Sequence, residues 1–155
     1  MATSVFLETD AGRKRALQQR LAALLPEWFG KPEANAEYAD QAEVLDGYVA
    51  EVNGVRRGLV LLKRHSPKSA EVYWMGVDPG VHRLGIGRAL IDTVTEACRQ
   101  SGVKYLFVAT LHPDDLYEPY QRTRKFYAAM QFEYVLEEQS PADPENPIAY
   151  YLREL

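Results

Sequence analysis

The sequence is poor in cysteine and lacks any long apolar run, and both absences narrow what the protein can be. One of its 155 residues is a cysteine, Cys98, so no disulfide can form within the chain. That usage is typical of the reducing cytoplasm. No stretch approaches the ~20 apolar residues that a membrane-spanning helix requires, and the first residues lack the apolar core of a secretory signal. We therefore expect a soluble cytoplasmic protein that has no membrane partner.

An excess of positive charge is also absent. The chain has 18 Lys and Arg against 22 Asp and Glu, a formal net charge of −4, whereas a nucleic-acid binder needs a basic surface. The three histidines, His65, His82 and His112, fall in separate predicted loops without the spacing of metal ligands, so no metal site is expected. No Gly-x-Ser-x-Gly motif or Cys–His arrangement indicates a covalent acyl-enzyme.

Length and hydrophobic pattern predict one mixed α/β domain covering residues 1–155, with a central, mostly antiparallel sheet flanked by helices. Asn53-Gly54 predicts a hairpin between two strands. The predicted order is β-α-α-β-β-β-α-β-α-β-β. Strands are expected at residues 4–7, 44–52, 55–63, 71–77, 103–110, 132–138 and 148–153. Helices are expected from Asp10 to about Leu25, from Pro32 to about Gln41, from the glycine pair at 85 and 87 to Gly102, and at 120–130; residues 64–69, 112–119 and 140–147 are expected to be loops.

The most informative stretch runs from Glu71 to Ser101. It reads as a strand, a loop with Gly85 and Gly87, and an amphipathic helix. A glycine-bearing loop at a helix N-terminus offers unpaired amides and a positive dipole end, which together bind phosphate. The motif of a P-loop, Gly-x-x-x-x-Gly-Lys-Ser/Thr, and the Gly-x-Gly-x-x-Gly of a dinucleotide fold both fail here, because Arg88-Ala89-Leu90 follows Gly87.

Two separated motifs resemble the GNAT superfamily of N-acetyltransferases. His82-Arg83-Leu84-Gly85-Ile86-Gly87, preceded by Val77-Asp78-Pro79, is similar to the acyl-CoA loop Gln/Arg-x-x-Gly-x-Gly/Ala with its upstream Val-x-Pro. Phe126-Tyr127-Ala128-Ala129-Met130-Gln131-Phe132 resembles the Phe-Tyr-x-x-x-Gly-Phe that ends the last helix of the family. The chain departs at three positions, with His82 for Gln or Arg, Gln131 for Gly, and Tyr120 for the Asn that often precedes the last helix.

The resemblance implies transfer of an acetyl group from acetyl-CoA to a primary amine by direct attack, with a small molecule or a peptide as acceptor. It implies that Tyr127 protonates the leaving thiolate, that Glu71 is the general base, and that the Met75 N–H stabilises the oxyanion beside a strand bulge at Gly76. Implied acceptor contacts are Trp28, Phe29 and Tyr73. Implied cofactor contacts are Val77, His82, Arg83, Leu84, Gly85, Ile86, Gly87, Arg88, Tyr120 and Thr123. Members of the family are often homodimers.

Several alternatives stay open at this point. A chain of waters can replace Glu71 as the base, and Asp114 and Glu118 are reserve carboxylates. Trp28 and Phe29 can equally anchor the corner between the first two helices. A catalytically silent acyl-CoA sensor would keep the phosphate loop without turnover, and the three departures from the family motifs are compatible with it.

Overall fold

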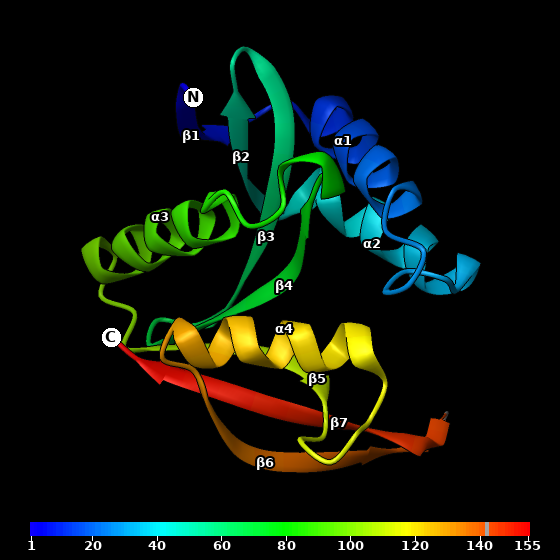
Figure 1. Ribbon diagram of the computed structural model, residues 1–155. Coiled ribbons are helices and arrows are strands. Elements are labelled where there is room, and N and C mark those ends of the chain that lie inside the picture. The colour runs from blue at the N-terminus through cyan, green and yellow to red at the C-terminus, as the bar shows by residue number, and fades with distance from the viewer. Residues whose placement is uncertain (142) are drawn as a thin grey trace. The chain divides into compact units, whose positions relative to one another are not determined.

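The computed structural model describes residues 1–141 and 143–155 and divides the chain into two compact units. The first unit comprises Met1–Lys63 and Tyr73–Ala97, and the second comprises Arg64–Val72 and Cys98–Leu155. Figure 1 shows the elements of each unit. The expectation of a single domain stays a prediction.

The described residues form seven strands, four α-helices and one 3-10 turn, in the predicted order (Figure 1). The strands are β1 (Thr3–Glu8), β2 (Asp46–Val52), β3 (Val55–Ser66), β4 (Ser69–Val77), β5 (Tyr105–Leu111), β6 (Glu133–Ser140) and β7 (Asp143–Glu154). The helices are α1 (Ala11–Ala23), α2 (Pro32–Val44), α3 (Ile86–Gln100) and α4 (Glu118–Ala129), and the 3-10 turn η1 covers Pro79–Val81.

The strands follow one another across the sheet in the order β1-β2-β3-β4-β5-β7-β6. The pairs β1–β2, β2–β3, β5–β7 and β6–β7 are antiparallel, whereas β4 pairs with β5 in parallel over Ser69–Glu71. The mixed α/β fold class and the mostly antiparallel sheet are therefore confirmed, with one parallel pair where α3 connects β4 to β5.

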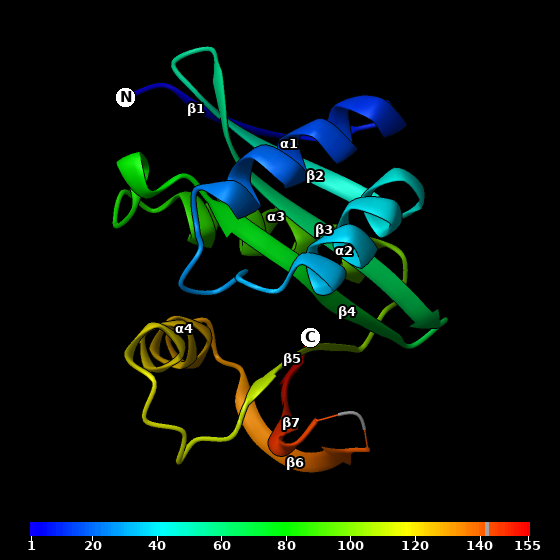
Figure 2. The same cartoon turned by 90° about the vertical axis from the view of Figure 1, so that its right-hand side faces the viewer.

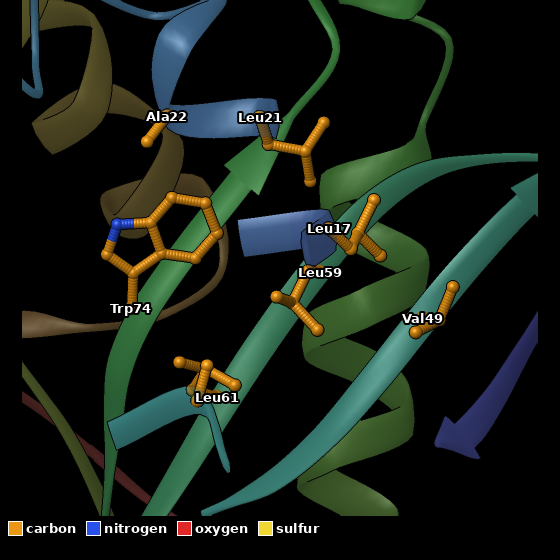
Figure 3. Close-up of a cluster of buried hydrophobic side chains, with 8 residues drawn as sticks. Leu17, Leu21, Ala22, Val49, Leu59, Leu61 and Trp74 are labelled. Carbon is orange, nitrogen blue, oxygen red and sulfur yellow. The ribbon is translucent and has the colours of Figure 1, made fainter. Parts of the chain in front are cut away.

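In the first unit, helices cover both faces of the strands. Leu17 and Leu21 of α1 pack with Leu59 of β3 in a core that Figure 3 shows between α1 and three strands, β2, β3 and β4. On the other face, α3 lies close to β3, because a Cβ added to Gly58 would stand 3.1 Å from Leu90 Cδ1. Figure 2 shows α1 and α2 on one side of these strands and α3 on the other. Successive strand residues face opposite sides. Position 58 therefore faces α3, and Leu59, the next residue, faces α1.

In the second unit, α4 lies along the β5–β7–β6 strands (Figure 1). Its end follows a pattern common in proteins: the Phe132 amide donates to the Tyr127 carbonyl at 2.9 Å, and Gln131 takes a left-handed backbone with φ 70°. This is the geometry in which glycine is usual after a helix. Gln131 therefore occupies the backbone position that the glycine of the family motif would suit.

Three boundaries differ from the sequence prediction by three residues or more. The second helix continues to Val44, which was expected to start a strand. Residues 64–69 do not form a loop, because β3 runs to Ser66 and β4 begins at Ser69 around a turn at Pro67–Lys68. Of the loop expected at 140–147, Asp143–Pro147 belongs to β7 and Ser140 ends β6, paired with Asp143; Ala142 lies outside the described residues.

Candidate active site

The loop between β4 and α3 is held by a partly buried ion pair. Asp78 Oδ2 lies 3.0 Å from Arg57 Nη1 on β3, and Asp78 Oδ1 accepts the Gly80 amide at 2.8 Å. The Asp78 amide also donates to the Arg57 carbonyl at 2.7 Å. Burial alone would raise the pKa of Asp78, but the Gly80 amide and the Arg57 guanidinium outweigh it and hold that pKa below its usual value. The carboxylate is therefore charged at neutral pH and ties the loop to β3.

The phosphate loop, residues 83–88, presents main-chain amides that the protein does not use. Among the described residues, the amides of Gly85, Ile86, Gly87 and Arg88 have no acceptor, while the Ala89 amide starts the helical ladder by donating to the Gly85 carbonyl at 3.0 Å. Four unpaired amides at the start of a 15-residue helix form the kind of site that binds an anion.

Backbone geometry and space both fit a phosphate at this loop. Arg83 and Gly85 take left-handed conformations, with φ 64° and 83°, and turns of this kind gather amides into anion-binding concavities. A Cβ added to Gly85 would meet no protein atom within 4 Å, so the space over this glycine is open. The side chains of Arg83 and Arg88 are exposed and add positive charge. These residues fit the diphosphate of a coenzyme A.

His82 stands apart from the other loop residues. Its amide donates to the Pro79 carbonyl at 3.3 Å, and its Nε2 donates to the Val77 carbonyl at 2.7 Å. The ring also meets the Trp28 ring edge-on, with centroids 6.5 Å apart. His82 thus braces the loop and links it to Trp28, and only Nδ1 is left for a cofactor contact. The Val77 carbonyl, which belongs to an expected cofactor contact, already accepts this hydrogen bond.

The residues expected to contact the acceptor, Trp28, Phe29 and Tyr73, are all partly exposed. Phe29 packs between Trp74, at 5.1 Å, and Tyr38 of α2, at 6.2 Å, and so anchors the corner between α1 and α2. Tyr73 also meets Tyr38, at 5.7 Å, and its ring lies 5.5 Å from Lys63 Nζ. The contact roles of Trp28, Phe29 and Tyr73 stay predictions.

The strand around Met75 alternates regularly in burial. Trp74 and Gly76 are buried, whereas Tyr73, Met75 and Val77 are partly exposed. A Cβ added to Gly76 would stand 2.4 Å from Trp74 Cη2, so the tryptophan that lies over this glycine excludes a side chain there. The bulge expected at Gly76 and the role of the Met75 N–H stay predictions.

In the second unit, Tyr127 is a buried residue of α4. Its ring lies 5.2 Å from Phe126 and 5.4 Å from Phe132, so the three aromatic residues of the second motif pack together. Burial raises the pKa of the Tyr127 phenol, and the hydroxyl has no hydrogen-bond partner among the described residues. It is therefore a proton-bearing group without a protein acceptor.

Glu71 has a partner that the sequence analysis missed. Its Oε1 lies 2.8 Å from Nε2 of His65, and the imidazole stacks near Phe107 at 5.1 Å. The sequence placed His65 in a loop, but the structure places it in β3, just before the turn into β4. The missed signal was the short turn Pro67–Lys68, which brings the end of one strand beside the start of the next.

The remaining candidates on α4 and its approach are partly engaged. Tyr120 meets the Tyr117 ring at 5.6 Å, and the Thr123 hydroxyl donates to the Pro119 carbonyl at 3.2 Å. Glu118 pairs with Arg122 at 2.9 Å, an exposed helical ion pair. The cofactor contacts of Tyr120 and Thr123 stay predictions.

Comparison with known proteins decides the family. Residues 14–132 match the model of the acetyltransferase (GNAT) family. The chain belongs to the GNAT acetyltransferase family. A search of curated proteins finds no match. The resemblance, the enzyme class and acetyl-CoA as the cofactor of this family are thereby confirmed.

Solved GNAT structures share the fold over nearly the whole chain. A GNAT-family protein from Desulfovibrio desulfuricans has a TM-score of 0.82 at 19% identity and covers 99% of both chains. Ard1 from Thermoplasma volcanium has a TM-score of 0.75 at 16% identity, covering 100% of this chain and 99% of its own. A GNAT acetyltransferase from Elizabethkingia anophelis with acetyl-CoA bound has a TM-score of 0.72 at 14% identity, covering 99% and 98%.

Two departures from the GNAT motifs have a structural account. His82 replaces Gln or Arg and uses its ring within the loop, and Gln131 keeps the left-handed backbone of the glycine it replaces. Neither change occupies the free amides of the phosphate loop. Among the described residues, no helix is both long and apolar enough to cross a membrane.

Proposed function

We propose that this protein transfers an acetyl group from acetyl-CoA to a primary amine by direct attack. The observation that carries the proposal is the row of four unused amides from Gly85 to Arg88, under open space at Gly85. Without a bound anion, these four amides at the start of α3 would depend on water alone for an acceptor.

Different residues of the chain have separate proposed roles in cofactor binding and catalysis. The amides of the phosphate loop hold the diphosphate, with charge from Arg83 and Arg88. When bound, acetyl-CoA supplies a thioester whose carbonyl carbon an amine can attack. By the family resemblance, the Met75 N–H stabilises negative charge on the thioester oxygen. Tyr120, Thr123 and the main chain of Val77 contact the pantetheine arm.

Removal of a proton from the acceptor is the other requirement. A primary amine has a pKa near 10, so about one molecule in a thousand is neutral at pH 7, a deficit of roughly 4 kcal/mol. A positioned base offsets this cost. The hydrogen-bonded pair of Glu71 and His65 is proposed to provide this base.

Tyr127 remains the proposed acid, with a constraint from its burial. Because burial raises its pKa, the phenol is fully protonated at neutral pH, but full transfer to a thiolate, whose conjugate acid has a pKa near 8.5, is uphill. We therefore assign to Tyr127 a hydrogen bond to the departing sulfur, with proton transfer coupled to recovery of a proton from the product nitrogen.

The test begins with binding and continues with turnover. Acetyl-CoA should raise the melting temperature, and a thiol-release assay over small amines and peptides with free amino termini should then identify the acceptor. Binding without release from any amine would support the alternative, a silent acyl-CoA sensor. No shift with acetyl-CoA or CoA would refute the phosphate loop itself.

A cytoplasmic location and a homodimer complete the proposal. The first is supported by a single cysteine that is fully buried, Cys98, whose thiol pKa burial raises, so the thiol is unreactive. The second rests on the family resemblance alone, and sedimentation of the purified protein tests it.

A further inference from the structure

His65 and Glu71 form a hydrogen-bonded pair at the turn end of the β3–β4 hairpin. Glu71 Oε1 accepts from His65 Nε2 at 2.8 Å, and the side chains are 15% and 37% exposed. Nδ1 of His65 has no partner among the described residues. The carboxylate is thus mostly enclosed, whereas the imidazole keeps one accessible nitrogen.

The hydrogen bond fixes which nitrogen can act. A carboxylate only accepts, so Nε2 must carry the proton of the neutral imidazole and Nδ1 must hold the free lone pair. We propose that His65 is the general base of the reaction, with Nδ1 taking the proton of the acceptor amine and Glu71 serving as a positioning residue. This inference rests on the proposed function.

The surroundings of the imidazole suit this role. Phe107 of β5 packs against the ring at 5.1 Å and restricts its rotation, and Tyr150 of β7 meets Phe107 at 6.1 Å. Tyr150 donates its hydroxyl to Glu138 of β6 at 2.9 Å. The titratable groups around the pair are therefore Tyr150 and, bonded to it, Glu138.

Imidazole is also a better base than a carboxylate for this reaction. A base is most effective when its titration lies near the working pH, and among side chains imidazole alone changes charge between pH 5 and 8 without perturbation. Over one turnover the ammonium group loses two protons. One goes to His65 Nδ1 and then to solvent; the other leaves with the sulfur as the C–N bond forms and the C–S bond breaks, giving an amide and a free thiol.

Two nearly isosteric substitutions separate the role of His65 as the base from the role of Glu71 as a positioning residue. In His65→Gln, the side-chain amide nitrogen can take the place of Nε2 and still donate to Glu71, but there is no basic nitrogen. In Glu71→Gln, the imidazole keeps an acceptor for Nε2 but loses the neighbouring charge. We expect kcat/KM to fall about 100-fold or more in His65→Gln, and the acidic limb of its pH profile to be abolished. In Glu71→Gln the acidic limb should persist, because the imidazole is still present.

Nitrogen chemical shifts of the histidine side chains give a readout that needs no turnover. In the free protein at high pH, His65 should show a protonated Nε2 and an unprotonated Nδ1, and Glu71→Gln should change the His65 signals only. His112 is a matched control, because its Nε2 also lies near a carboxylate, Glu137, at 3.3 Å. His112→Asn should leave the pH profile unchanged.

The outcomes are distinguishable. Near-normal turnover in His65→Gln with a large loss in Glu71→Gln would make Glu71 the base and overturn the inference. Normal turnover in both would assign the proton to water and overturn it as well. Release of no thiol by the unmodified protein, with any amine at any pH, would instead refute the proposed function, and the catalytic role of His65 with it.

Discussion

Substitution of Gly85 by alanine separates binding of the cofactor from stability of the fold. The residue has φ 83°, which an L side chain tolerates poorly, and its Cβ would meet no protein atom within 4 Å. The cost to the fold is therefore backbone strain alone, about 1 kcal/mol. For a chain of this length that corresponds to a fall in melting temperature of about 2–4 °C.

The effect on acetyl-CoA should be larger than the effect on the fold. An added methyl would stand in the open space over the phosphate loop, where the diphosphate is proposed to lie. Loss of one amide–phosphate hydrogen bond removes about 1.5–3 kcal/mol, or roughly 10- to 150-fold in Kd. Isothermal titration with acetyl-CoA measures this directly, and Gly85→Val should bind no detectable cofactor.

Gly54 supplies a matched control for this experiment. It has φ 81° in the β2–β3 turn, and a Cβ there also meets nothing within 4 Å. Gly54→Ala should therefore lower the melting temperature as much as Gly85→Ala does, with acetyl-CoA affinity unchanged. Unchanged affinity in Gly85→Ala would refute the phosphate loop, and equal loss of affinity in both variants would mean that strain in the fold is the cause.

Three other variants test separate features of the chain. Tyr127→Phe should lower kcat about 10- to 100-fold with acetyl-CoA affinity unchanged, as stopped-assay and titration data would reveal; normal kcat would remove the hydroxyl from the acid role. Gln131→Gly should raise the free energy of unfolding by about 0.5–1 kcal/mol in urea, because glycine adopts φ 70° without strain; a loss would contradict the helix-end geometry. Asp78 has a lowered pKa, so its stabilising contribution is present above its unfolded pKa of about 3.9 and is lost as pH falls through the folded pKa. Asp78→Asn should accordingly cost stability at pH 7 and progressively less below pH 4, and a constant difference across pH would refute the charge argument.

The features that the sequence predicted well are those with local causes. Asn53-Gly54 predicts its turn because both residues accept left-handed backbone, and they have φ 50° and 81°. The phosphate loop is predictable for the same reason, since a glycine and the start of a helix are visible in a few adjacent residues. Asp10 predicts the start of α1, and its Oδ1 accepts the Arg13 amide at 2.8 Å.

The features that it missed depend on partners far along the chain. Residues 64–68 are exposed, so nothing local distinguishes strand ends from a loop, and the pairing of Ser69 with Tyr105 of β5 places the start of β4. Residues 143–147 contain two prolines and still join β7, whose first described pair is Asp143 with Ser140 at the outer side of the sheet. The His65–Glu71 pair was invisible because it requires both corrected boundaries at the β3–β4 turn.

The hairpin of β3 and β4 carries both halves of the proposed chemistry along its length. Arg57, near the start of β3, holds the phosphate loop through Asp78, whereas His65, near its end, meets Glu71 at the start of β4. The two ends should have different kinetic signatures. The phosphate loop binds a part of the cofactor that does not react, so Gly85→Ala should act mainly on KM. His65 acts on a proton that moves only during reaction, so His65→Gln should act on kcat. If a variant at either end changed kcat and KM in proportion, the cause would be distortion of the hairpin and not the loss of cofactor binding or of the base alone.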